Sequence, residues 1–110
     1  MVTMVKLAPF AVRYAAEAMR HLRSIEPKHH SLIRSEVEDQ LIFEPNLETR
    51  NRKPLKRPVD FGAEWELRFG PDNRFRVFYQ IDVEKHEVHV LAIGIKEGNR
   101  LVIGGEELRL

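Results

Sequence analysis

The part of the chain that most constrains its fold is residues 63–96, AEWELRFGPDNRFRVFYQIDVEKHEVHVLAIGIK. Apolar and polar residues alternate in its first two segments, which is the period-two pattern of strands that bury one face. The turn-forming run Gly70-Pro71-Asp72-Asn73 separates these segments. A third segment, Val88 to Ile95, is almost continuously apolar, so we expect it to be central in the sheet and covered on both faces. The stretch predicts three strands joined by two short turns.

The second of these strands divides its side chains between two faces of the sheet. The first face carries Phe75, Val77, Tyr79 and Ile81, and the second carries Arg74, Arg76, Phe78 and Gln80. If the preceding turn closes a hairpin, Arg68 lies opposite Arg76. The arginines then predict a small cationic surface whose planar guanidinium groups suit phosphate oxygens. The alternative is that they are solvated outward residues, paired across strands with Glu64, Glu66 or Glu87.

Before these strands, the sequence predicts one further strand and two helices. Met4 to Ala8 is short and apolar, and its position before Pro9 favours an extended backbone. Apolar residues at helical spacing predict a helix from about Phe10 to Ser24. A second helix can open at Pro27 and must stop near Glu44-Pro45. Each helix has one apolar stripe, so we expect both to pack against the sheet.

Two other segments show no sustained periodicity. Asn46 to Gly62 is predicted to be mainly loop, and Gly104-Gly105 is predicted to loosen the tail, with Glu106 to Leu110 forming at most a frayed turn. The order of elements predicts an α+β fold, in which an N-terminal strand and a helical hairpin pack on an antiparallel sheet. One core is expected to contain Trp65, Leu67, Val77, Tyr79, Val90 and Ile33.

The composition fits a single domain over residues 1–110, since 110 residues with 43% hydrophobic content suffice for one compact core. The formal charge of +1 predicts no strong attraction of the whole molecule to polyanions. The absence of cysteine excludes disulfides and thiolate metal sites, which fits a reducing cytosol. No apolar run approaches the roughly 18 residues needed to span a bilayer, and the amino terminus does not resemble a signal peptide. The expected compartment is the cytoplasm.

Positive charge is concentrated in one segment, Thr49 to Arg57. It contains no acid and carries Arg50, Arg52, Lys53, Lys56 and Arg57. Beside an arginine-bearing sheet, such a segment is typical of nucleic-acid binding, so we expect these residues and Arg74 to bind RNA. Trp65 and Phe78 could stack on an exposed base, although the alternation places Trp65 in the core. The same cations also suit an acidic protein partner.

The histidines offer a weaker signal. His29 and His30 are adjacent, hence about 100° apart on a helix, and no carboxylate at a familiar spacing completes a metal site with them. His86, in a predicted turn, and His89, in the last strand, are candidates for proton transfer near neutral pH, with polar surface as the alternative. The sequence contains no glycine-rich phosphate loop and no nucleophile motif. We therefore expect neither a metal nor a cofactor.

Four short stretches carry a resemblance to a known family: RKPLK at residues 52–56, WELR at 65–68, FRVFYQI at 75–81 and IGIK at 93–96. With the order of elements, they make the chain similar to toxins of the RelE/ParE superfamily, small cytoplasmic proteins of type II toxin–antitoxin systems, from about Val5 to Leu101. The resemblance implies a helical hairpin on a curved antiparallel sheet. In the RelE-like branch the concave sheet face binds messenger RNA in the ribosomal A site and cleaves it without metal. In the ParE-like branch a related surface acts on DNA gyrase.

The resemblance also implies roles for individual residues. Arg76 matches the strand arginine that contacts the scissile phosphate. Arg68 matches a basic residue on the neighbouring strand, and Lys96 matches the basic position after the last strand. The chain departs from the pattern at Glu66, where such enzymes often carry lysine, and around Leu101-Val102, where aliphatic residues replace an aromatic residue or histidine.

Two hypotheses follow. The first is a metal-independent endoribonuclease that inhibits translation, in which Arg76 and Arg68 stabilise a phosphorane formed by the RNA 2′-hydroxyl. Lys96 would bind a flanking phosphate or the leaving group, and Glu66 or His89 would be the base. The second is a gyrase-directed or inactive member that serves only protein contacts, which the incomplete proton-transfer set favours. Both imply a cognate antitoxin protein as partner, with the ribosome and messenger RNA, or DNA gyrase, as target.

Overall fold

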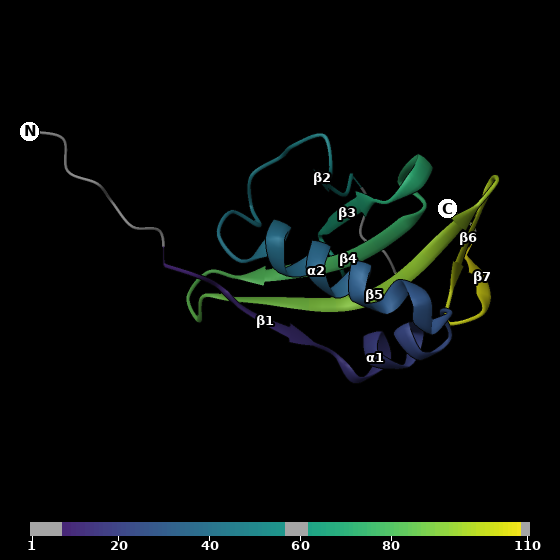
Figure 1. Ribbon diagram of the computed structural model, residues 1–110. Helices are drawn as coiled ribbons and strands as arrows, with labels where there is room; N and C mark the ends of the chain where they lie inside the picture. Colours follow the sequence, from purple (N-terminus) through teal and green to yellow (C-terminus); the bar gives the residue numbers. More distant parts are fainter. Residues whose placement is uncertain (1–7, 57–61, 109–110) are drawn as a thin grey trace, which may run out of the picture.

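The computed structural model describes residues 8–56 and 62–108 (Figure 1). In chain order its elements are β1 (Ala11–Tyr14), α1 (Ala16–Arg23), α2 (His30–Leu41), β2 (Arg52–Pro54), β3 (Trp65–Phe69), β4 (Phe75–Asp82), β5 (Glu87–Glu97), β6 (Arg100–Ile103) and β7 (Glu106–Leu108). Short 3₁₀ turns precede α2 at Pro27–His29 and join β3 to β4 at Pro71–Asn73. No helix in the described part of the chain is long and apolar enough to cross a membrane.

β5 is the central strand of a seven-stranded sheet. The strand order is β2-β3-β4-β5-β6-β7, and β1 also pairs with β5. β4 runs antiparallel along one edge of β5. The opposite edge is shared, because β1 pairs in parallel with residues 87–90 and β6 pairs antiparallel with residues 94–97. The predicted central strand is therefore confirmed.

Both helices lie over one face of the sheet and share its core (Figure 1). The predicted core is confirmed: Ile33, Leu67, Val77, Tyr79 and Val90 are buried together, and Trp65 packs against them. Trp65 and Tyr79 are cross-strand neighbours whose stacked rings have centroids 6.1 Å apart. The Tyr79 hydroxyl donates a 2.7 Å hydrogen bond to the carbonyl oxygen of Pro45. The core thus also anchors the loop after α2, and the α+β fold is as predicted.

The N-terminal strand lies later in the chain than predicted. Met4 to Leu7 lies outside the described residues, and Ala8 is not in a strand. The first residues of the helix predicted from Phe10 instead form β1, and the Ala15 N–H after it donates a 2.9 Å hydrogen bond to the carbonyl oxygen of Val90. Pairing with the open edge of β5 overrides the weak local helix propensity, so α1 begins only at Ala16.

Two segments that were predicted to be irregular form strands. β2, inside the predicted loop, pairs antiparallel with β3. Gly104-Gly105 does not loosen the tail but makes the tight turn between β6 and β7. Both glycines have positive φ, 61° and 83°, a region that glycine adopts without steric cost. Strands this short carry too little periodicity to be recognised in the sequence. Residues 109–110 of the predicted tail lie outside the described part.

A smaller apolar cluster covers part of the opposite face of the sheet. Its buried members are Ala63, Phe78, Ala92 and Leu101. Phe78, considered above for stacking on a base, is fully buried and offers no ring to a ligand. This cluster leaves only part of that face open.

A histidine of α1 completes the shared edge of β5. Neither β1 nor β6 pairs with residues 91–93, and in this gap the N–H of Ile93 donates a 3.2 Å hydrogen bond to Nδ1 of the buried His21. Nδ1 can accept this bond only when it carries no proton. Burial lowers the pKa of His21, an effect that Glu17 opposes and Arg20 increases. The neutral imidazole therefore accepts the hydrogen bond that a carbonyl oxygen of a neighbouring strand would otherwise accept.

Leu67→Ala should lower the free energy of unfolding by about 2–5 kcal/mol, because it removes buried methyl groups and leaves a cavity in the core. Denaturant titration measures this change. Leu47→Ala is the matched control, since Leu47 is 51% exposed and its loss should change stability by less than about 0.5 kcal/mol. A loss below about 1 kcal/mol at Leu67 would contradict its place in the core.

Stability should fall as the pH drops below 6.5, the ordinary pKa of histidine, because the unfolded chain then binds a proton at His21 that the folded chain does not. Above that pH both states hold a neutral ring and the contribution is complete. Denaturant titrations between about pH 8 and pH 5, the range in which histidine titrates, measure how steeply the free energy of unfolding changes with pH. His21→Gln cannot take up a proton, so its slope should be shallower. Equal slopes for the two proteins would show that His21 does not contribute to the pH dependence.

Candidate functional site

The β3–β4 hairpin brings a carboxylate between two arginines. The predicted pairing is confirmed, with Arg68 opposite Arg76, and Glu66 precedes Arg68 by two residues on the same face. Oε1 of Glu66 accepts hydrogen bonds from Nε of Arg68 and, at 3.0 Å, from Nη1 of Arg76. We call these three side chains the Arg–Glu–Arg cluster. It gathers three of the predicted site residues into a unit with one net positive charge.

Arg76 pairs with Glu66, as the alternative interpretation expected, but its side chain is buried and not solvated. Its exposed fraction is 7%, and its Nε donates a 2.9 Å hydrogen bond to the carbonyl oxygen of Asn73. Burial lowers the pKa of Arg76, an effect that Glu66 opposes and Arg68 increases. The guanidinium remains charged, because arginine is not deprotonated in proteins. Hydrogen bonds at Nε and Nη1 fix the orientation of this guanidinium. Removing the Arg76 side chain would therefore lower the stability of the fold as well as remove a positive charge.

Arg68 is the more accessible arginine of the cluster. Its side chain is 38% exposed, and within the described residues its Nη groups have no hydrogen bond to protein. The backbone of Arg68 is held by Asn51, whose carbonyl accepts its N–H and whose side-chain amide donates to its carbonyl, both at 2.8 Å. Asn51 and Asn73 were not predicted, since each acts through a contact that only the folded chain creates.

A second pair of cations adjoins the cluster. Arg74 and Lys96 line an open cleft of about 440 Å³ together with Pro71, Asp72 and Gly98. The N–H of Lys96 donates a 2.7 Å hydrogen bond to the carbonyl of Arg74, so the two residues are neighbours across strands. Neither forms an ion pair with any described residue. Two unpaired cations beside open space are suited to an anion.

On the side of β5, the cluster faces a residue without a side chain. Gly94 pairs with Arg76, and a Cβ atom there would lie 2.8 Å from both Cγ1 of Ile103 and the carbonyl oxygen of Val102. Glycine therefore allows β6 to pack closely against β5. Leu101 is buried and Val102 is half-buried at this side, where the resemblance led us to expect an aromatic residue or histidine. The wall of the site on β6 is apolar and offers no group for proton transfer.

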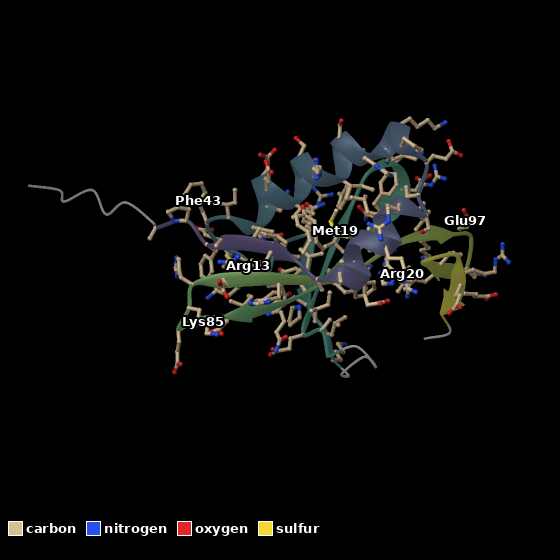
Figure 2. The ribbon with its side chains drawn as sticks, turned by 90° about the horizontal axis from the view of Figure 1, so that it is seen from below. Arg13, Met19, Arg20, Phe43, Lys85 and Glu97 are labelled. Carbon is tan, nitrogen blue, oxygen red and sulfur yellow. The ribbon has the colours of Figure 1, made fainter. Side chains whose placement is uncertain are left out.

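His89 does not join the cluster. It pairs with Gln80, four residues beyond Arg76 on β4, which corresponds to about 13 Å along the strand. Its Nε2 lies 3.2 Å from Oε1 of Glu87, whose other oxygen accepts a 2.5 Å hydrogen bond from Nε of Arg13. Figure 2 shows Arg13 near the end of the molecule that carries Lys85, while Glu97 lies at the opposite end. The side chains of Arg76 and His89 thus belong to different parts of the sheet.

The basic segment is split between structural and exposed residues. Arg52 was predicted to bind RNA, but it is buried, with Nε donating to the Leu47 carbonyl at 3.1 Å and Nη1 donating to the Gln40 carbonyl. It serves to tie this segment to the end of α2. Arg50, Lys53 and Lys56 are exposed, and Lys53 pairs with Glu66 in the β2–β3 register. Arg57 lies outside the described residues.

Other histidines make structural contacts. Nε2 of His30 lies 2.8 Å from the carbonyl oxygen of Ile25, so this side chain contacts the backbone that precedes α2. The ring of His86, a candidate for proton transfer, stacks on Phe10 with centroids 3.7 Å apart. These contacts lie outside the Arg–Glu–Arg cluster.

Comparisons with known proteins agree with this architecture. No family model and no curated protein matches the sequence. A similar solved structure is the RelBE2 toxin–antitoxin complex from Mycobacterium tuberculosis, with a TM-score of 0.67 and 27% sequence identity. The similarity covers 83% of this chain and 95% of that chain, so it spans the helices and the sheet together. In fold and in sequence, the chain is therefore similar to a RelE-like toxin, as the resemblance predicted.

Proposed function

We propose that this protein is the toxin of a toxin–antitoxin pair and that it acts in the cytoplasm as a metal-independent endoribonuclease on ribosome-bound messenger RNA. The observation that carries this proposal is the meeting of four cations at one end of the sheet. Arg68 and Arg76 lie in the Arg–Glu–Arg cluster, and Arg74 and Lys96 line the adjoining cleft. Several cations gathered in this region suit the phosphates of a single strand.

In the proposed reaction the RNA provides its own nucleophile. The 2′-hydroxyl attacks the adjacent phosphate and expels the 5′-oxygen of the next nucleotide, leaving a cyclic phosphate. Arg68 and Arg76 would stabilise the charge that develops on the phosphorane, and Lys96 would hold the flanking phosphate or the leaving group. The protein would contribute mainly position and charge, with water carrying the protons.

A specific observation favours a second candidate function. In this function the toxin binds a protein target such as DNA gyrase, or it has no catalytic activity. Glu66 partly neutralises both arginines, and among the described residues no histidine lies in the cluster. An enzyme that lacks its proton-transfer groups loses about 10²–10⁴ in rate. Such a loss is compatible with a slow nuclease and equally with a surface used for binding alone.

The proposed partner is an antitoxin. The similar structure from Mycobacterium tuberculosis is a toxin–antitoxin complex, which supports this assignment. We expect acidic side chains of the antitoxin to lie over Arg74 and Lys96, because exposed cations without ion pairs complement such a partner. Binding there would block access of RNA to the same cations.

Arg68→Ala and Arg76→Lys should each reduce cleavage of messenger RNA in a translating extract by about 10²–10³, the usual effect of removing one donor to a developing anion. Arg76→Lys keeps a cation in the buried position, and Arg68 is half-exposed, so both variants are expected to fold. Arg13→Ala is the matched control, since Arg13 pairs with Glu87 away from the cluster. Breakage of messenger RNA at the parental rate in both variants would refute the assignment. Inhibition that is seen only in a supercoiling assay would favour the second candidate function.

Neutralising Arg50, Lys53 and Lys56 together should weaken RNA binding without abolishing cleavage of bound RNA. Each lost phosphate contact should flatten the log–log dependence of affinity on salt by about 0.7 for a single strand. The control replaces Arg20, Arg23 and Lys28, three exposed cations on or near α1. If both triple variants show the parental slope, the basic segment is merely solvated.

A further inference from the structure

We propose that Glu66 is a positioning residue, which holds Arg68 and Arg76 so that their remaining N–H groups converge on one phosphate. The proposal rests on the proposed RNA-directed function and deepens it. It also changes the role of Glu66 from the candidate base that the sequence suggested to the counter-ion that organises the anion site. The burial and the hydrogen bonds of the three side chains support it.

Arg68 and Arg76 would repel each other without Glu66. They form a directly opposed cross-strand pair, and like charges at opposed positions destabilise a sheet. Glu66 lies diagonally from Arg76 and next to Arg68 on the same face, so one carboxylate reaches both guanidinium groups. A single oxygen, Oε1, accepts from both. By accepting hydrogen bonds from both guanidinium groups, the carboxylate offsets their mutual repulsion.

The contacts of the cluster leave part of each guanidinium without a hydrogen bond to the described residues. A guanidinium has five N–H groups. Among the residues that the structure describes, Arg76 uses two of them, toward Asn73 and Glu66, and Arg68 uses one, toward Glu66. Both arginines are therefore held by protein and still have N–H groups for a ligand. Donors that are fixed before the substrate binds stabilise developing charge without reorganisation, which is the condition for an effective anion site.

Burial argues against Glu66 as the base. The residue is 4% exposed, and Oε1 already accepts two charge-assisted hydrogen bonds. Protonation at either oxygen would remove the negative charge that lies between two cations, one of them also buried. Removing the charge of Glu66 would instead leave Arg76 as a desolvated cation with no carboxylate, so its side chain would turn toward solvent.

The first test needs no RNA. Arginine side-chain ¹⁵N–¹H spectra of the full chain should show slow guanidinium rotation and slow proton exchange for Arg76. Glu66→Gln should remove both. Glu87→Gln is the matched control, because Glu87 also accepts from an arginine Nε and a histidine Nε2, away from the cluster, and its change adds the same charge. Arg76 signals that average like those of exposed arginines in the parent chain, or that stay unchanged in Glu66→Gln, would overturn the proposal. The measurement on the parent chain applies even if Glu66→Gln does not fold.

The second test separates positioning from base catalysis. Glu66→Gln should lower kcat for RNA cleavage on the order of 10²-fold through misplaced arginines. In an Arg68→Ala background its effect should be smaller than in the parent chain, because only Arg76 is left for Glu66 to hold. A full second loss in that background, with unchanged arginine spectra, would identify Glu66 as the base instead. If the parent chain cleaves no RNA, the proposed function fails while the spectra still decide the role of Glu66.

Discussion

The described fold depends on the division of one edge of β5 between two strands. β1 occupies the first part of that edge and β6 the second, and neither could extend along the whole edge without excluding the other. The residues left between them would expose an unpaired N–H beside the core, and His21 of α1 satisfies it. This contact adds a hydrogen bond to the apolar packing between the first helix and the central strand. It also couples the packing of α1 to the protonation of an imidazole.

The same strand separates the two polar clusters of the sheet. Near its start, Glu87 holds Arg13 and His89 at an accessible edge. Near its end, Gly94 lets β6 approach, so the Arg–Glu–Arg cluster has an apolar wall beside it. The two clusters are similar in composition but differ in how strongly their charges interact. The exposed cluster is strongly screened by water, whereas the buried one keeps its geometry and most of its electrostatic strength.

Burial also explains how a chain with almost no net charge could act on a polyanion. The formal charge is +1, so long-range attraction is weak. Affinity in such a protein must come from a few cations in fixed positions. Glu66 reduces the charge of its cluster but restricts the motion of both arginines, which lowers the entropy that binding must remove. Arg74 and Lys96, which form no ion pair with any described residue, supply the positive charge that Glu66 neutralises within the cluster.

The sequence by itself determined the three long strands, the α+β class and the core. Alternation in β3 and β4 and a continuous apolar run in β5 report which side chains are buried, and the order of the elements indicates the class. Only the tertiary structure decided where short segments belong. β1, β2 and β7 have three or four residues each, and they are strands because a neighbouring edge was open to them. Tertiary structure also decided the site. Alternation placed Arg76 on the outward face, but whether that face meets water, a carboxylate or a second apolar cluster depends on segments distant in sequence, and no local pattern encodes that contact.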